Sequence, residues 1–437
     1  MARPIGVDLF SGAGGMSLGF EQAGFDVVAA VELDPVHAAV HKYNFPRCAV
    51  LPRSVTDVSG DDIRRAAKIG DRRVDVVFGG APCQGFSLIG QRALDDPRNS
   101  LVKDFVRIVR ELDAKSFIFE NVKGLTVGKH RKFLFELIEE FEEAGYDVQK
   151  DWRVLNAADY GVPQDRQRLI LMGAKRGFDL PSYPAAIGER PTCDAALGDL
   201  PDAETFEELR MSDSVKTSAF GMPSKYAEAL RGLGNDAWAF GYPRKWDPNR
   251  LTSSARTEHT EISRRRFQET EQGRVEPISR LFKLPVDGVS NTLRAGTDSA
   301  RGAFTSPRPI HYAHARCVTV REMARLHGFP DWFRFNVTKW HGARQIGNAV
   351  PPPLARAVAS ALIRALGVEP TRPTEAIDLG EERLLAMGST EASQHFQVEN
   401  PIGRRDKKSG AKKRKQEEIE ELYALNRRAQ FVDGVAG

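Results

Sequence analysis

Residues 5–175 alternate short apolar runs, rich in β-branched side chains, with longer amphipathic stretches. This alternation is typical of parallel strands joined by helices. We expect strands at residues 5–10, 27–32, 74–78, 117–120 and 168–173. The pattern therefore predicts an open, doubly wound, Rossmann-like α/β sheet, in which ligands bind just beyond the carboxyl ends of the strands.

The connecting helices are predicted from their apolar faces. Residues 101–112 and 133–144 each place apolar side chains on one helical face, and Gly145 has the position of a helix C-cap. Further along, Thr319 and Glu322 have the spacing of a capping box, which predicts the start of another helix.

The alternation stops after residue 177, where prolines, glycines and serines begin to interrupt short apolar runs. We therefore expect an α/β domain (1–177), a second, smaller and irregular domain (178–317), a segment that returns to the first domain (318–367) and a polar, partly disordered tail (368–437). Residues 403–415 of the tail hold eight Lys or Arg against one Asp. A solvated segment is favoured there over an arm that tethers DNA.

Composition narrows the class of protein. With 437 residues, 41% of them hydrophobic, the chain can bury a real core. No apolar run approaches the roughly 20 residues that cross a bilayer, and no signal peptide is evident, so we expect a cytoplasmic protein without membrane contact. The four cysteines, Cys48, Cys83, Cys193 and Cys317, lack the spacing of disulfide frameworks or metal sites. The net charge of +4 is too small to identify a polyanionic partner.

The first predicted strand leads into DLFSGAGG, where Gly12 and Gly14 allow a sharp turn and a close approach to a ligand. A plain strand-to-helix turn is the alternative for this loop. Glu32, at the end of the second strand, has the position to bind ribose hydroxyls, and Asp57 has a position suited to an adenine amino group. The loop and the two acids together predict nucleoside binding.

Two further strand ends carry reactive groups. Cys83 lies in GGAPCQGFS after the third strand, where a thiol would face a bound substrate, although a lone cysteine is more often an inert core residue. Glu120 ends the apolar run of FENV, where burial raises the pKa of a carboxyl. A fold-supporting ion pair is the alternative for Glu120. Arg166 and Arg168 alternate onto one face of the last strand, suited to hold phosphate, carbonyl or carboxylate oxygens.

The glycine-rich loop, PCQ, FENV and QxRxR, in this order, strongly resemble the motifs of the cytosine-C5 DNA methyltransferase family. Residues 321–330, REMARLHGFP, look like the family's REAARLQGFP segment, and residues 345–350, QIGNAV, look like another of its elements. The matched segments cover residues 5–175 and 318–366. His327 departs from the Gln that is frequent at its position, and the tail has no family counterpart.

This resemblance implies a reaction. Cys83 adds to C6 of a cytosine while Glu120 hydrogen bonds the N3 edge, and Arg166 and Arg168 position and polarise the base. The C5 atom then takes a methyl group, because it becomes nucleophilic only after the thiolate has added. S-adenosylmethionine is the implied donor, without a metal. The implied cofactor contacts are Phe10, Gly12, Gly14, Glu32, Asp57, Pro82, Leu101 and Asn348.

Duplex DNA is the implied substrate, and because its reacting ring atoms are stacked inside the helix, the cytosine must be flipped out. Residues 84–99 are the expected lid, with Gln84, Ser87 and Arg92 as DNA contacts. Base readout would come from the irregular domain. The candidates there are Arg256, Arg264, Arg265, Arg266, Arg294 and Arg301. For each arginine, a phosphate contact or simple solvation stays an alternative.

The expected setting is a bacterial restriction–modification system, with a monomeric enzyme that forms no stable complex with a cognate endonuclease. The close alternative is a tRNA cytosine-C5 methyltransferase of the same family, which the long basic insert at 178–317 disfavours. A non-enzymatic nucleic-acid-binding module is disfavoured because Cys83, Glu120, Arg166 and Arg168 occur together. The absence of GxGxxG disfavours a dinucleotide oxidoreductase.

Overall fold

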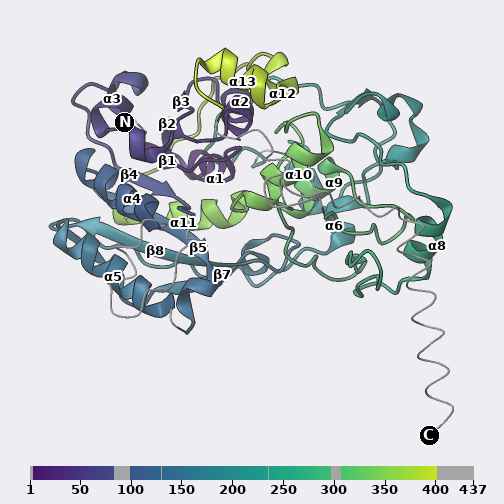
Figure 1. Ribbon diagram of the computed structural model, residues 1–437, viewed down its shortest axis with the longest axis horizontal. Coiled ribbons are helices and arrows are strands. Elements are labelled where there is room, and N and C mark those ends of the chain that lie inside the picture. The colour runs from purple at the N-terminus through teal and green to yellow at the C-terminus, as the bar shows by residue number, and fades with distance from the viewer. Residues whose placement is uncertain (1–2, 83–98, 129, 235, 297–306, 401–437) are drawn as a thin grey trace, which may run out of the picture.

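The computed structural model describes residues 3–82, 99–128, 130–234, 236–296 and 307–400 (Figure 1). Its centre is a sheet with strand order β3-β2-β1-β4-β5-β8-β6, in which β7 pairs with β8. The strands are β1 Ile5–Leu9, β2 Asp26–Val31, β3 Ala49–Leu51, β4 Val76–Gly79, β5 Ser116–Val122, β6 Tyr146–Val148, β7 Arg153–Asn156 and β8 Gln167–Lys175. Each predicted strand overlaps one of these, and the chain winds outward in both directions from β1. The doubly wound α/β prediction is confirmed.

The direction of β8 corrects the expectation that all the predicted strands are parallel. β1 pairs in parallel with β2 and β4, and β4 with β5, but β8 runs antiparallel to β5, β6 and β7. The chain passes from β7, which ends at Asn156, to β8, which begins at Gln167, without a helical crossover. Parallel neighbours need a crossover of a dozen or more residues, so this connection permits only an antiparallel pair.

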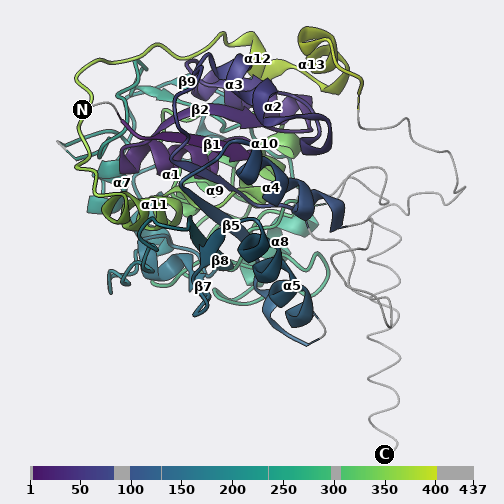
Figure 2. The same ribbon diagram turned by 90° about the vertical axis from the view of Figure 1, so that its left-hand side faces the viewer.

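Helices cover both faces of the sheet (Figure 2). One face carries α3 Gly60–Ala67, α4 Ser100–Glu111 and α5 His130–Glu143, and the other carries α1 Gly15–Ala23, α2 Pro35–Asn44 and α11 Pro352–Ala365. Because successive strand residues point to opposite faces, β5 serves both layers. Phe117 stacks on Phe141 of α5 with ring centroids 3.7 Å apart, whereas Ile118 packs in the cluster of α1 and α11.

The irregular domain has little regular structure in its described residues. Its elements are α6 Cys193–Leu197, α7 Lys225–Leu230, α8 Glu261–Glu269, β9 Val215–Lys216 and β10 Arg250–Leu251. Instead of a large core of its own, it is attached to the returning segment through buried polar side chains. Arg325 pairs with Asp199 at 3.0 Å and with Asp331 at 2.6 Å, and Arg321 donates to the Thr252 hydroxyl at 2.7 Å.

The returning segment contains α9 Val320–Leu326 and α10 Lys339–Asn348. The predicted capping box is confirmed: the Thr319 hydroxyl accepts from the backbone N–H of Glu322, and the Glu322 carboxylate accepts from the backbone N–H of Thr319. Arg316 also binds this carboxylate at 2.7 Å. A motif recognised by its sequence thus serves here as a rigid joint between the two domains.

Part of the segment expected as a polar, partly disordered tail is folded. Beyond α11, residues 377–396 include α12 Arg383–Ala386 and α13 Ser389–Phe396, and both helices pack on α2. Leu384, Leu385 and Ala392 are buried there, so apolar side chains spaced within a polar sequence were sufficient to dock the segment. The basic residues 403–415 lie outside the described residues.

Candidate functional site

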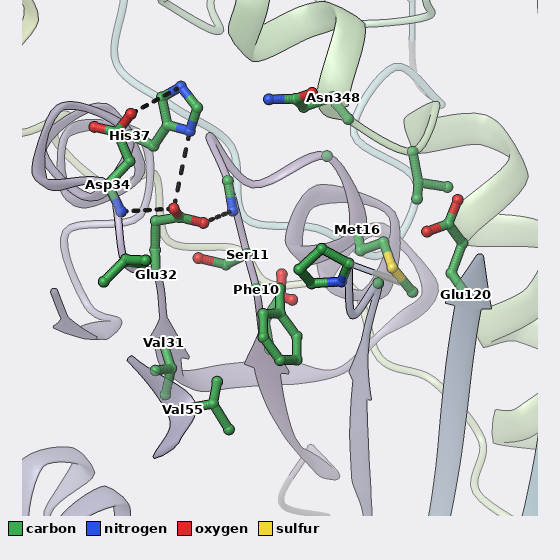
Figure 3. Close-up of a pocket in the computed structure, with 18 of the residues that line it drawn as sticks. Phe10, Ser11, Met16, Val31, Glu32, Asp34, His37, Val55, Glu120 and Asn348 are labelled. Carbon is green, nitrogen blue, oxygen red and sulfur yellow. Dashed lines mark hydrogen bonds and ion pairs between the residues drawn. The ribbon is translucent and has the colours of Figure 1, made fainter. Parts of the chain in front are cut away.

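A cavity of about 480 Å³ opens at the carboxyl ends of the parallel strands (Figure 3). Phe10 follows β1, Glu32 follows β2, Pro82 lies just beyond β4, and Glu120 stands near the end of β5. All four line the cavity, at the edge of the sheet where ligands of this fold class bind. The volume lies within the range of small-molecule and cofactor sites.

The glycine-rich loop bends along one wall of the cavity. Phe10 and Gly12 have positive φ angles of 60° and 55°, and both line the cavity. Gly14, predicted as a cofactor contact, instead caps α1 with a φ of 105°. A Cβ atom on Gly14 would lie 2.4 Å from the Phe45 ring, so this glycine is required by packing behind the loop. It does not line the cavity.

Glu32 joins the loop to the start of α2. Its Oε2 accepts from the backbone N–H of Gly12 at 2.7 Å, and its Oε1 accepts from the backbone N–H of Asp34 at 2.8 Å. Burial raises the pKa of the Glu32 carboxyl, and His37, 3.9 Å away, opposes that rise. Each carboxylate oxygen keeps a lone pair for a ligand hydroxyl.

The predicted contact Asp57 is not part of the cavity wall. It ends a short 3-10 helix, Val55–Asp57, and its side chain is exposed to solvent. Ser54 and Val55, earlier in the same turn, line the cavity instead. The turn after β3 was located correctly from the sequence, but the direction of each side chain within a single helical turn depends on packing.

The opposite wall comes from a distant part of the chain. Asn348, as predicted, lines the cavity from the end of α10, and Leu101 lines it from the start of α4. Trp340 and Arg344 also line it, and the sequence reasoning missed both. Trp340 lies eight residues and Arg344 four residues before Asn348, so the three side chains share one helical face. This spacing is a sequence signal from which both residues could have been predicted.

Glu120 and Arg168 form an ion pair at the cavity edge, with 2.8 Å between Glu120 Oε1 and Arg168 Nε. Burial raises the pKa of the Glu120 carboxyl, and the positive charges of Arg168 and Arg166 partly offset this rise. A Cβ atom on Gly80 would lie 2.4 Å from Glu120 Oε2, so the glycine makes room for the carboxylate. The Glu120 carboxylate is therefore held by an ion pair at the edge of the cavity.

Arg166 differs from Arg168 although only one residue separates them. Its guanidinium is buried and donates to the carbonyl oxygens of Leu293, Gly347 and Ala349 at 2.8–3.0 Å. Burial lowers the pKa of Arg166 to about 9. These contacts tie the strand to the QIGNAV element, and they direct the Arg166 guanidinium to the protein frame. The contact between Arg166 and the base stays a prediction.

His327, the departure from the family's usual Gln, takes part in the same joint. Its Nε2 donates to the Ala349 carbonyl at 3.0 Å, and its Nδ1 accepts from Gln164 Nε2 at 2.9 Å. Burial holds the pKa of His327 well below its usual value, which matches a neutral ring with this tautomer. The imidazole thus links QxRxR to QIGNAV.

Cys83, with Gln84, Ser87, Arg92 and Arg301, lies outside the described residues. Its immediate neighbour Pro82 lines the cavity, and the carbonyl of Ala81 accepts from Asn121 Nδ2 at 2.9 Å. The segment that leads into Cys83 is thereby held beside the end of β5.

The arginines predicted to contact DNA fall into two groups. Arg256 and Arg264 pair with Glu207 and Glu204, at 3.4 Å and 2.6 Å. Arg266 lies 3.9 Å from Glu276. Arg265 and Arg294 are exposed. Arg294 also lines a small hollow that includes Arg280, Asn291 and Arg308. Acidic neighbours therefore compete with DNA for the first group, whereas no acidic side chain among the described residues forms an ion pair with Arg294.

A buried polar network that the sequence reasoning missed reaches the cavity wall at Asp8. Ser17 Oγ donates to Asp8 Oδ2 at 2.6 Å and lies 3.0 Å from His41 Nε2. Burial raises the pKa of Asp8 to about 8; the hydrogen bond from Ser17 opposes this rise, and the charge of Glu32 adds to it. Asp8 opens DLFSGAGG, but its partners come from two different helices. Spacing alone therefore could not have paired them.

The described residues hold neither a membrane-spanning helix nor a cluster of metal ligands. Among them, no helix is long and apolar enough to cross a membrane. The same part of the chain holds no group of three or more His, Cys, Asp or Glu side chains arranged for a metal ion.

The fold and the site define an α/β protein with a strand-end cavity that is lined by the buried Glu120 carboxyl. The sequence model of the family described as C-5 cytosine-specific DNA methylase matches residues 6–364, and the chain belongs to this family. It is 60% identical to Type II methyltransferase M.XorII of Xanthomonas oryzae over 92% of this chain and 94% of that protein. It is 36% identical to Type II methyltransferase M1.HphI of Haemophilus parahaemolyticus, over 82% and 86% of the two chains.

The fold is also similar to that of a solved DNA modification methyltransferase. The crystal structure of a putative DNA modification methyltransferase encoded within an Escherichia coli prophage has a TM-score of 0.68 and 33% identity to this chain. It covers 84% of this chain and all of its own. The predicted family and the predicted activity, methylation of cytosine C5 in DNA, are confirmed, and the tRNA alternative is not supported.

Proposed function

We propose that the strand-end cavity binds S-adenosylmethionine, with Glu32 accepting hydrogen bonds from the ribose hydroxyls. The cavity supports this assignment by its chemistry: Phe10, Val31 and Val55 form an apolar slot suited to a purine ring, and the Glu32 carboxylate stands at its edge. When bound, this cofactor supplies an electrophilic methyl group on a sulfonium. Pro82, Leu101 and Asn348 are proposed as further contacts.

We propose that Cys83 is the nucleophile. The thiolate adds to C6 of the flipped-out cytosine, forming a C6–S bond and placing electron density on C5 and on the N3 edge. Glu120, whose pKa is raised by burial, shares its proton with N3 and stabilises that density. After methylation, loss of the C5 proton to solvent returns an electron pair to the ring and breaks the C6–S bond.

In this mechanism Arg168 is proposed to orient Glu120 and to contact the base, because its guanidinium is already placed beside the carboxyl. Arg166 is proposed as a positioning residue that holds the start of strand β8 against the QIGNAV element. The observation that carries the proposal is the Glu120–Arg168 pair at the cavity edge, next to the segment that leads into Cys83.

The substrate is proposed to be a specific sequence in duplex DNA, read by the irregular domain. Arg294 is favoured for DNA contact because it is exposed, and Arg280 lines the same hollow. The relatives named above are Type II methyltransferases. We therefore propose that this enzyme protects DNA in a restriction–modification system, as a monomer that forms no stable complex with an endonuclease.

The covalent step is tested with duplex DNA that carries 5-fluorocytosine at the target position. Because fluorine does not leave as a proton does, the C6–S bond persists and the complex survives a denaturing gel. We expect the unmodified enzyme to be trapped in the presence of S-adenosylmethionine, and Cys83→Ser to give no adduct. Cys317→Ser is the matched control and should still trap DNA. An adduct with Cys83→Ser would contradict the assignment.

A further inference from the structure

Residues 377–396, here called the C-terminal clasp, follow the part of the chain that the family's sequence model matches, which ends at residue 364. The clasp contains α12 and α13, and both views of the molecule show these helices lying against α2 (Figures 1 and 2). Leu384, Leu385 and Met387 are at most 5% exposed. The clasp is therefore a packed part of the fold that lies beyond the residues matched by the family's sequence model.

The clasp packs on the helix that forms one wall of the cofactor cavity. Leu385 belongs to an apolar cluster with Val36 and Tyr43 of α2. The same helix begins at the cavity: Asp34 is its N-cap, and His37 lies in its first turn (Figure 3). The clasp thus packs on a helix whose first turn lines the cavity.

The clasp is also hydrogen-bonded to the segment just before α10, the helix that forms the opposite wall of the cavity. The backbone N–H of Val337 donates to the Leu385 carbonyl at 3.0 Å. Asn336 Nδ2 donates to the Met387 carbonyl at 3.0 Å. The helix α10 begins two residues after Val337. Its cavity-lining residues are Trp340, Arg344 and Asn348.

The start of the clasp has its own fixed attachment. The backbone N–H of Ile377 donates to the Pro243 carbonyl at 2.9 Å, and the Lys245 N–H donates to the Ile377 carbonyl at 3.0 Å. Glu382 lies 3.3 Å from Arg250. The segment is therefore held at the irregular domain as well as at α2 and ahead of α10.

We propose that the C-terminal clasp is a positioning element that sets the separation of α2 and α10 and thereby the affinity for the methyl donor. Leu385 is its central residue, because its side chain packs on α2 while its carbonyl binds the segment before α10. Holding two distant walls in their binding arrangement lowers the ordering cost of ligand binding. The proposal rests on the proposed binding of S-adenosylmethionine in this cavity.

Coupling between two sites is reciprocal, so bound cofactor must stabilise the docked clasp as much as the docked clasp strengthens binding. We expect S-adenosylmethionine to slow amide hydrogen exchange of the unmodified enzyme about fivefold or more in residues 384–396. Helix α8 is the internal control and should not change. If residues 32–37 become protected while 384–396 do not, the clasp proposal is wrong. If neither segment responds, the cofactor assignment itself fails.

The same coupling can be measured by changing the clasp and following the binding of the cofactor. Leu385→Ala should weaken S-adenosylmethionine binding about tenfold in calorimetric titration of the folded protein, and Leu385→Met should restore most of the affinity. Leu209→Ala removes the same atoms from a cluster in the irregular domain that does not line the cavity. This control should lose stability but bind the cofactor within about twofold of the unmodified enzyme. Equal losses of affinity in both alanine variants would overturn the proposal, as would unchanged affinity in folded Leu385→Ala.

Discussion

The Glu120–Arg168 pair at the strand-end cavity and the Arg325 cluster under the irregular domain contain the same chemical groups in different surroundings. Glu120 remains 12% exposed, and its described ion pair is with Arg168 alone. Arg325 and Asp199 are fully buried, and Arg325 binds Asp331 as well. The comparison shows that spare hydrogen-bonding capacity, not charge as such, separates a group that can act on a ligand from one that holds the fold.

The same distinction separates carboxyl groups by pKa. Burial raises the pKa of Glu120, whereas the pKa of Glu322 is lowered to about 2 because Arg316 and the Thr319 N–H outweigh the effect of its burial. A carboxyl that is fully bonded stays ionised, and one that is buried with fewer bonds can hold a proton. The four predictions below test this contrast.

Glu120→Gln should have the largest effect. Without a carboxyl to share a proton with the base, methyl transfer should slow by about 10²–10⁴-fold. Cofactor affinity and thermal stability should stay close to those of the unmodified enzyme, because the side chain keeps its shape. Single-turnover methyl transfer and calorimetry measure the two quantities. A large loss of cofactor binding with an unchanged chemical step would contradict the assigned role.

Arg325→Met should lower the stability of the protein and leave the rate of methyl transfer nearly unchanged. It leaves Asp199 and Asp331 buried without their cation, which typically costs about 3–5 kcal/mol in the free energy of unfolding. The variant's chemical rate, measured on the folded fraction, should remain within about threefold, since Arg325 does not line the cavity. Urea unfolding measures the first quantity. Normal stability would show that the cluster does not hold the two domains together.

The pH dependence of stability should separate the two carboxyls. The Glu322 pKa is depressed, so its contribution is complete above the ordinary value of 4.5 and is lost as the pH falls toward 2. The pKa of Glu120 is raised, so its contribution to the free energy of unfolding is present at low pH and is lost as the pH rises through its own raised pKa. Glu322→Gln should therefore remove part of the acid-induced loss of stability below pH 4.5. An identical acid profile in that variant would contradict the prediction.

The smallest expected effect is the difference in DNA affinity between Arg294→Ala and Arg264→Ala. Arg294 is exposed, and its loss should weaken DNA binding by about 1–3 kcal/mol if it reads a base. If it contacts phosphate, the slope of affinity against salt should fall by about one. Arg264, bound to Glu204, should matter less. Fluorescence anisotropy at several salt concentrations measures both. A larger loss for Arg264→Ala would reverse the grouping of these arginines.

Much of the site could be predicted because the fold places strand ends together. Glu32 and Glu120 were predicted from their positions at strand ends, Phe10 and Pro82 came from the family resemblance, and all four line one cavity. Leu101 and Asn348 came from the family resemblance and line it too. The direction of β8 could not be predicted, because hydrophobic alternation identifies a strand without giving its orientation.

The sequence by itself determined the doubly wound sheet, the glycine-rich loop, the capping box and the family, since each rests on spacing within a short segment. Only the tertiary structure decided that Asp57 points to solvent, that Arg166 binds three backbone carbonyls while Arg168 meets Glu120, and that an apparently polar tail docks on α2. The physical reason is that partners far apart in the chain settle a side chain's role. Local spacing shows which groups are available, and burial and hydrogen bonding decide which of them remain free for chemistry.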